Sequence, residues 1–182
     1  GEDKTRVFRV GAPGLDEINK YEPRPSQNFS EWLGLSHCQK SALVLFHPDF
    51  YDNDSCDQQL ETIIRSCVRC KLKTILLAPN LDAGSENMMG YIQQKKLLCP
   101  NHIFQHLDRS KYLWVLDNVD VFIGNSSSGI IESASFGTPF INLGKRQQFR
   151  EQNNNTFNCD IDENQLVKKI FEALNYRNAD LN

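Results

Sequence analysis

The chain has 182 residues, of which 40% are hydrophobic and 24% are charged. This composition is typical of one folded globular domain and excludes a disordered, collagenous or coiled-coil chain. Lys and Arg number 20 against 23 Asp and Glu, a net charge of −3, so the basic excess of a general nucleic-acid-binding protein is missing. No apolar run approaches the roughly 18 residues of a membrane-spanning helix, and no secretory leader is recognisable. We therefore expect a cytoplasmic protein that binds neither nucleic acid nor membranes.

Short apolar runs alternate along the chain with segments of helical periodicity. In chain order, the first half predicts a strand at Val7–Val10, a short helix from Leu15, a helix at Phe29–Leu35, a strand at Ala42–Phe46, a helix capped by Asp54 or Ser55 that reaches about Lys71, and a strand at Thr74–Ala78. The second half predicts a helix at Ser85–Leu98, a short strand from Ile103, helix at Tyr112–Leu116, strand at Val121–Ile123, helix at Ile130–Phe136, strand at Phe140–Leu143, an Asn-rich loop over 151–158 and a helix at Glu163–Leu174.

The predicted strands are short and almost wholly apolar, which is typical of a parallel sheet covered by helices on both faces. Residues 1–182 are therefore predicted to form a single doubly wound, Rossmann-like α/β domain. In such sheets, ligands bind at the carboxyl ends of the strands. Polar residues capable of chemistry do follow the predicted strands directly: His47, Asn80, residues 125–128, and Lys145 with Arg146.

The stretch from Val121 to Glu132 predicts a phosphate site. A strand runs here into small polar residues at the start of a helix, where backbone N–H groups are unpaired and attract anions. Ser126, Ser127 and Ser128 add hydroxyl donors, Gly129 allows a ligand to come close, and Glu132 can accept hydrogen bonds from the two vicinal hydroxyls of a ribose. The alternative interpretation is an ordinary serine-rich helix start.

Three other motifs do not fit these residues. A nucleophile elbow requires G-x-S-x-G, and neither Ser126 nor Ser127 is flanked by both glycines. A Walker loop requires Gly-Lys followed by Ser or Thr, and a dinucleotide fingerprint requires G-x-G-x-x-G. The pattern therefore favours a bound phosphate over a serine nucleophile, and it calls for no cofactor.

Two further residues are candidates at the same edge of the sheet. Arg146 can neutralise a phosphate, or it belongs to a surface basic cluster. His47 can hydrogen-bond a phosphate or act as an acid or base near neutral pH, or it is structural. Cys67 and Cys70 form a C-x-x-C without the second pair of a zinc site, and their place late in a helical pattern favours buried thiols in a reducing compartment. The histidines show no metal-binding spacing, so no metal site is predicted.

Several segments together resemble the hydrolysing UDP-N-acetylglucosamine 2-epimerases of sialic-acid and related nonulosonate synthesis. The similar segments cover nearly the whole chain and occur in the family's order: residues 1–3 with 10–13, 46–48, 79–85, Ile123–Glu132, and 137–139 with 141–147. The most specific of them is Gly-Asn-Ser-Ser-Ser-Gly-Ile-Ile-Glu at 124–132, followed by Gly-x-Arg-Gln.

The resemblance implies a GT-B-like enzyme of two Rossmann-type domains, of which this chain is the C-terminal, UDP-binding half. It places His47 at the diphosphate, assisting departure of UDP, with Ser126, Ser127 and Arg146 at the phosphates and Glu132 at the ribose. The backbone around Leu107 borders the uracil, and Asn80 lines the pocket. The family is also oligomeric, so a homo-oligomer is implied.

The family's catalytic carboxylates belong to an N-terminal domain that this sequence does not include, so Gly1 is interpreted as the seam between the two domains. The 182 residues are expected to bind a UDP-sugar's nucleotide without turnover. Two other functions remain open: the donor-binding domain of a GT-B glycosyltransferase, or a non-catalytic sensor of nucleotide sugars.

Overall fold

In the computed structural model, residues 3–8, 10–22, 28–47, 56–78 and 102–179 are described. Within them, six strands form one sheet in the order β3-β2-β1-β4-β5-β6, and every neighbouring pair is parallel. The strands are β1 (Ser41–Leu45), β2 (Lys73–Leu77), β3 (His102–Phe104), β4 (Val121–Gly124), β5 (Phe140–Leu143) and β6 (Thr156–Cys159). Since β1 lies between β2 and β4, the chain order reverses direction at β1. The predicted doubly wound parallel sheet is therefore confirmed.

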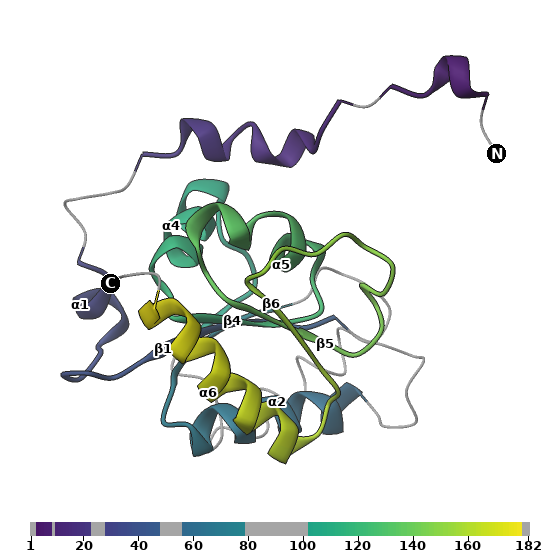
Figure 1. The fold of residues 1–182 in the computed structure, drawn as a ribbon. Coiled ribbons are helices and arrows are strands. Elements are labelled where there is room, and N and C mark those ends of the chain that lie inside the picture. Colours follow the sequence, from purple (N-terminus) through teal and green to yellow (C-terminus); the bar gives the residue numbers. More distant parts are fainter. Residues whose placement is uncertain (1–2, 9, 23–27, 48–55, 79–101, 180–182) are drawn as a thin grey trace.

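Helices cover both faces of the sheet (Figure 1). The α-helices are α1 (Phe29–Leu33), α2 (Cys56–Arg69), α4 (Arg109–Asn118), α5 (Ser127–Ile131) and α6 (Glu163–Ala179), and the 3-10 helices are η1 (Lys4–Arg6), η2 (Pro13–Leu15), η3 (Ile18–Lys20) and η4 (Ser133–Phe136). Figure 1 shows α2 and α6 side by side on one face, and α4 and α5 on the other. Among the described helices, none is long and apolar enough to span a bilayer.

The apolar core is divided by the sheet into two layers, because successive strand residues point to opposite faces. Ala42 and Val44 of β1 pack with the helices α2 and α6, whereas Leu43 and Leu45 pack with α1 and α4. All five residues of β1 are buried, as the unbroken apolar run predicted. Burial on both faces accounts for the lack of a polar–apolar alternation in this strand.

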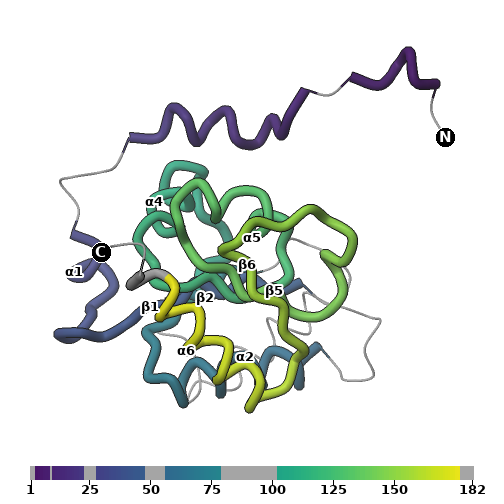
Figure 2. Tube along the Cα trace, in the orientation of Figure 1, coloured from purple at the N-terminus to yellow at the C-terminus, as the bar shows by residue number. Residues whose placement is uncertain are grey.

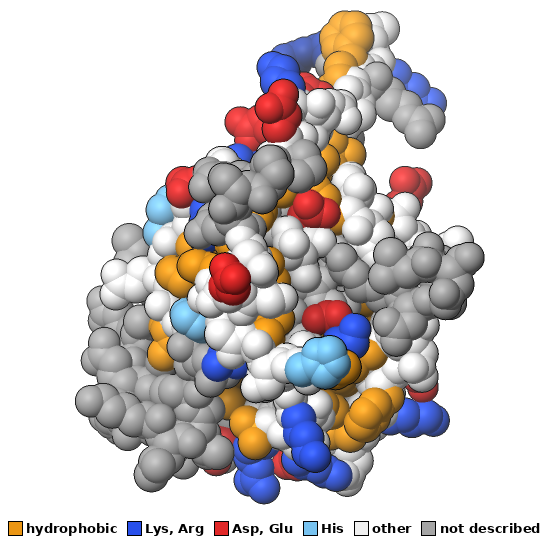
Figure 3. Space-filling model, turned by 90° about the vertical axis from the view of Figure 1, so that its left-hand side faces the viewer, with side chains coloured by type: hydrophobic (Ala, Val, Ile, Leu, Met, Phe, Trp, Pro, Cys, Tyr) orange, Lys and Arg blue, Asp and Glu red, His pale blue; other side chains and the backbone are white. Residues whose placement is uncertain are grey.

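The N-terminal segment differs from its predicted structure. Val7–Val10 was expected to be a strand, but its described residues form none, and Val7, Phe8 and Val10 are 63%, 77% and 77% exposed. A strand requires a neighbour for its backbone hydrogen bonds, and none of the described strands pairs with this segment. Figure 2 shows the N-terminal segment lying outside the body of the domain, and Figure 3 shows it projecting above the body with basic, acidic and hydrophobic side chains.

Other boundaries shift for local reasons. The predicted helix at Ile130–Phe136 is divided into α5 and η4, where the Ser133 hydroxyl donates to the Gly129 carbonyl at 2.6 Å and competes with the helical pattern. Strand β6 overlaps the end of the predicted Asn-rich loop over 151–158 and extends one residue beyond it. It is anchored by the Asn155 amide, which donates to the Ser133 hydroxyl at 2.8 Å and to the Thr138 carbonyl at 2.7 Å. The predicted helix at 85–98 and the caps at 54 and 55 lie outside the described residues.

Candidate functional site

Asn125 joins the ends of two neighbouring strands. It follows β4, which pairs with β1 on one side and β5 on the other, and it is fully buried. Its side-chain oxygen accepts a hydrogen bond from the His47 N–H at 2.8 Å, and its side-chain nitrogen donates to the His47 carbonyl at 2.9 Å. One amide thus satisfies both polar backbone groups of His47 and fixes the chain where β1 ends.

The loop after β5 is fastened to the same residue. The Arg146 guanidinium donates to the Asn125 backbone carbonyl at 3.1 Å, and the buried Gln147 amide donates to the same oxygen at 2.8 Å. Arg146 itself is exposed, and a guanidinium carries five N–H donors, so this bond leaves donors for a ligand. The predicted neighbours His47, Asn125 and Arg146 are therefore brought together at one edge of the sheet.

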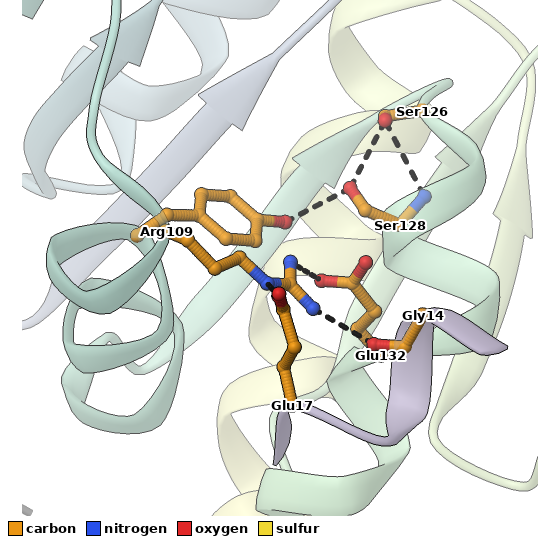
Figure 4. Close-up of polar contacts among 7 residues, drawn as sticks. Gly14, Glu17, Arg109, Ser126, Ser128 and Glu132 are labelled. Carbon is orange, nitrogen blue, oxygen red and sulfur yellow. Dashed lines mark hydrogen bonds and ion pairs between the residues drawn. The ribbon is translucent and has the colours of Figure 1, made fainter. Parts of the chain in front are cut away.

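The serine run begins α5. Ser126 is the N-cap residue, and its hydroxyl accepts from the Ser128 N–H. The Ser126 and Ser128 hydroxyl oxygens lie 3.0 Å apart, and the Tyr112 hydroxyl on α4 donates to the Ser128 oxygen at 2.9 Å (Figure 4). Ser127 is the first residue of α5. Because α5 has five residues and aligns few peptide dipoles, anion binding here depends mainly on hydroxyl and backbone donors.

Two glycines are required by packing. A side chain on Gly124, whose φ is +156°, would overlap the Leu45 carbonyl of the neighbouring strand. A side chain on Gly129 would overlap the Phe140 ring, and the Gly129 N–H donates to the Ser126 carbonyl at 3.1 Å. Close approach to a ligand was the predicted reason for Gly129, and the structure supplies a different one: contact between α5 and β5.

Glu132 lies at the end of α5 and is paired with a residue that the sequence did not single out. The Arg109 guanidinium, from the first residue of α4, donates to a Glu132 carboxylate oxygen at 2.8 Å. The Glu132 side chain is 13% exposed. This burial raises the pKa of the Glu132 carboxyl above its ordinary value, and the nearby Arg109 charge opposes the rise.

The same guanidinium reaches the N-terminal segment. It donates to the Glu17 carboxylate at 2.9 Å and to the Gly14 carbonyl at 2.9 Å. Figure 4 shows the Arg109 side chain between Glu17, Gly14 and Glu132, below the pair of serines. The pKa of Arg109 is raised, because hydrogen bonds and charge from Glu132 and Glu17 outweigh the opposing effect of its burial. Arg109 therefore connects the predicted ribose acceptor with residues far away in the sequence.

The remaining predicted residues are Leu107 and Asn80. Leu107 precedes α4 and is half-buried against the core layer of α1 and α4. Asn80 lies outside the described residues. In the part of the chain that the structure describes, no group of three or more His, Cys, Asp or Glu side chains is placed to hold a metal ion.

Sequence reasoning placed Asn125 among the polar residues that follow strands but gave it no role, and it gave Gln147, Tyr112 and Arg109 no role in the site either. Asn125 and Gln147 stand within the motifs quoted above, so their position next to ligand-binding residues was a usable signal. Arg109 lies 23 residues before Glu132 in the sequence, and the rest of helix α4, strand β4 and helix α5 come between them. No spacing rule connects the two, and only the packing of α4 beside α5 brings them together.

Comparison with known proteins shows the family of this chain. The sequence profile of the family described as UDP-N-acetylglucosamine 2-epimerase matches residues 1–181. The UDP-N,N'-diacetylbacillosamine 2-epimerase (hydrolyzing) of Legionella pneumophila is 37% identical over 175 residues, covering 96% of this chain and 46% of that protein. The UDP-N-acetylglucosamine 2-epimerase of Neisseria meningitidis serogroup B is 25% identical over 178 residues, covering 96% and 45% respectively.

Solved structures agree on the fold. The structure of Methanocaldococcus jannaschii UDP-GlcNAc 2-epimerase in complex with UDP-GlcNAc and UDP superposes with a TM-score of 0.67 at 15% identity, covering 96% of this chain and 49% of that one. The chain thus spans about half the length of the relatives it matches, and its fold is that of one half of a GT-B-like enzyme.

Proposed function

Because the chain belongs to the UDP-N-acetylglucosamine 2-epimerase family, we propose that it is the UDP-binding part of a hydrolysing 2-epimerase. The full enzyme releases UDP and a 2-epimerised acetamido sugar, N-acetylmannosamine or a related one, for nonulosonate synthesis. The observation that carries the proposal is the junction at Asn125, where a histidine, a serine run and an arginine from three different loops meet.

The diphosphate binds between the serine run and Arg146. Hydroxyls of Ser126, Ser127 and Ser128 donate to phosphate oxygens, together with backbone N–H groups at the start of α5. Arg146 supplies positive charge in a planar fork that matches two oxygens at once. The chain carries a net charge of −3, so the nucleotide is attracted by these local donors and not by the overall charge.

The nucleoside extends from the serine run along α5. Glu132 accepts hydrogen bonds from the vicinal ribose hydroxyls, and its low exposure of 13% strengthens these bonds by keeping water away. The uracil lies against the backbone around Leu107, at the start of the loop that leads into α4. Asn80 belongs to the same pocket in this proposal.

His47 assists the departure of UDP. Its imidazole lies at the carboxyl end of β1 and hydrogen-bonds the leaving diphosphate, stabilising the negative charge that develops as the bond to the sugar breaks. The two bonds from Asn125 fix the His47 backbone, which holds the imidazole in place. Removal and return of the proton at sugar C2 need carboxylates, which we assign to a further, N-terminal domain of the full enzyme. The chain alone therefore binds UDP and does not turn over.

The experiment is an assay of the full-length protein with UDP-N-acetylglucosamine and with UDP-N,N'-diacetylbacillosamine. We expect one of them to yield UDP and a free, 2-epimerised sugar in equal amounts, detected by chromatography and NMR. The 182-residue chain, assayed in parallel, should bind UDP and release no sugar. Release of UDP only when an acceptor is added would instead show a glycosyltransferase, and binding without any turnover by the full-length protein would show a sensor.

A further inference from the structure

Arg109 is held by three partners at once. Its Nη1 donates to Glu132 at 2.8 Å, its Nε to Glu17 at 2.9 Å and its Nη2 to the Gly14 carbonyl at 2.9 Å (Figure 4). All three guanidinium nitrogens are therefore engaged, and the group has one defined orientation. The cation also lies 5.9 Å from the centre of the Tyr112 ring, within the range of a cation–π contact.

The three contacts differ in what they contribute. The Glu17 side chain is 65% exposed, so its ion pair is screened by water and contributes little. Glu132 is 13% exposed, and a buried carboxylate without a paired cation is costly. The contact that matters most is therefore the one between Arg109 and Glu132, and the N-terminal partners serve to hold the guanidinium in place.

One face of α4 supports the predicted nucleotide site at two points. Arg109 and Tyr112 are three residues apart, so they lie on the same side of the helix. Arg109 donates to Glu132, and Tyr112 donates to the Ser128 hydroxyl at 2.9 Å. A helix that contributes no residue to the predicted contacts with UDP thus fixes the side chains at both the ribose and the phosphates.

We propose that Arg109 is a positioning residue that orients the Glu132 carboxylate toward the 2′- and 3′-hydroxyls of the ribose. This inference rests on the proposed function. Each carboxylate oxygen has two acceptor sites, and the Arg109 bond uses one of the four. Both ribose hydroxyls can therefore bind while the ion pair is kept, and Arg109 is needed for recognition of ribose rather than deoxyribose.

The test compares the binding of UDP and 2′-deoxy-UDP to the chain by calorimetry. The wild type should bind UDP roughly tenfold more tightly than 2′-deoxy-UDP, because only UDP has a 2′-hydroxyl to donate to the charged Glu132 carboxylate. In Arg109→Gln the Glu132 carboxylate loses its fixed orientation, so UDP binding should weaken about tenfold and deoxy-UDP binding should weaken less. The ratio of the dissociation constants of deoxy-UDP and UDP should then approach one. Arg109→Lys keeps the charge but not the fork and should retain an intermediate ratio.

Controls separate positioning from a merely structural role. Arg65→Gln removes an arginine on α2 that pairs with Glu163 at 3.3 Å, on the face of the sheet opposite α4, and should leave the ratio unchanged. Glu17→Gln removes the negative charge from the exposed contact only, since the amide oxygen can still accept from Arg109 Nε, and it should change the ratio less than twofold. A structural effect would weaken both nucleotides equally. If Arg109→Gln does not fold, as judged by circular dichroism, the Lys variant carries the test.

The outcomes distinguish the two proposals. If the wild type binds no UDP, the proposed function is wrong and the role of Arg109 falls with it. If it binds UDP in preference to deoxy-UDP and Arg109→Gln retains that preference, the inference about Arg109 is overturned while the proposed function stands. Equal binding of the two nucleotides by the wild type also overturns the inference, because Glu132 would then not contact the 2′-hydroxyl.

Discussion

Replacing Asn125 with Ala should weaken the fold and the candidate site together. The side chain forms two hydrogen bonds, at 2.8 and 2.9 Å, with the buried backbone of His47. Removing it takes one hydrogen bond from a buried backbone donor and one from a buried backbone acceptor, at about 1–3 kcal/mol each. We therefore expect the free energy of unfolding to fall by about 2–6 kcal/mol, a large part of the 5–15 kcal/mol typical of a domain.

Urea unfolding followed by circular dichroism measures this loss. The matched control is Asn164→Ala on the exposed side of α6, where the amide oxygen accepts from Arg69 at 3.1 Å, and its effect should stay within about 0.5 kcal/mol. A loss of less than about 0.5 kcal/mol in Asn125→Ala would refute the view that this amide fixes the end of β1.

Asn125→Asp tests the placement of the diphosphate. The carboxylate still accepts from the His47 N–H, but one of its oxygens faces the His47 carbonyl oxygen without a proton between them, and its charge is buried. The free energy of unfolding should therefore fall at least as far as in the Ala variant. The substitution also places a negative charge beside the predicted phosphate site, and like charges repel. UDP should therefore bind the Asp variant more weakly than the Ala variant, and the reverse order in calorimetry would contradict the placement of the diphosphate.

Three further predictions concern other parts of the chain. Arg146→Ala should weaken UDP roughly tenfold by calorimetry and uridine much less, and an equal loss for both would show that Arg146 does not contact phosphate. Gly129→Ala should lower the free energy of unfolding by about 1–3 kcal/mol in urea, because the new methyl group meets the Phe140 ring, and an unchanged stability would contradict that packing. Burial raises the pKa of the Cys67 thiol to about 12, so mass spectrometry after treatment with iodoacetamide at mildly alkaline pH should find Cys38 modified and Cys67 protected. Alkylation of Cys67 as fast as Cys38 would show that Cys67 is not buried. The stability that the protonated Cys67 thiol contributes is present below the ordinary thiol pKa and is lost as the pH rises toward 12.

The central strands could be predicted from the sequence because burial on both faces leaves a clear apolar signal. The Phe140–Leu143 prediction matches β5, and the Ala42–Phe46 prediction is shifted by one residue from β1. Strand β6 carried no such signal, since it lies at the edge of the sheet and its residues are only partly apolar. The Val7–Val10 prediction was wrong because an apolar run specifies a strand only when a neighbour is available to pair with it.

The candidate site was predictable to the extent that its residues follow strands directly. His47, Ser126 and Arg146 could be grouped because parallel strands bring their carboxyl ends to one edge. The supporting residues could not be grouped in this way. The Asn125 side chain forms hydrogen bonds with the backbone of His47, and Arg109 on α4 forms an ion pair with Glu132 at the end of α5. Both contacts depend on three-dimensional packing and not on sequence spacing.

The most direct test of the account is an NMR titration of the isotopically labelled chain with UDP. The account predicts saturable shifts of backbone amides at residues 125–129, around Glu132 and around Arg146, with little change in α2 and α6 on the other face of the sheet. Saturable shifts confined to other elements, or no shifts at millimolar UDP, would contradict the claim that this edge of the sheet binds the nucleotide.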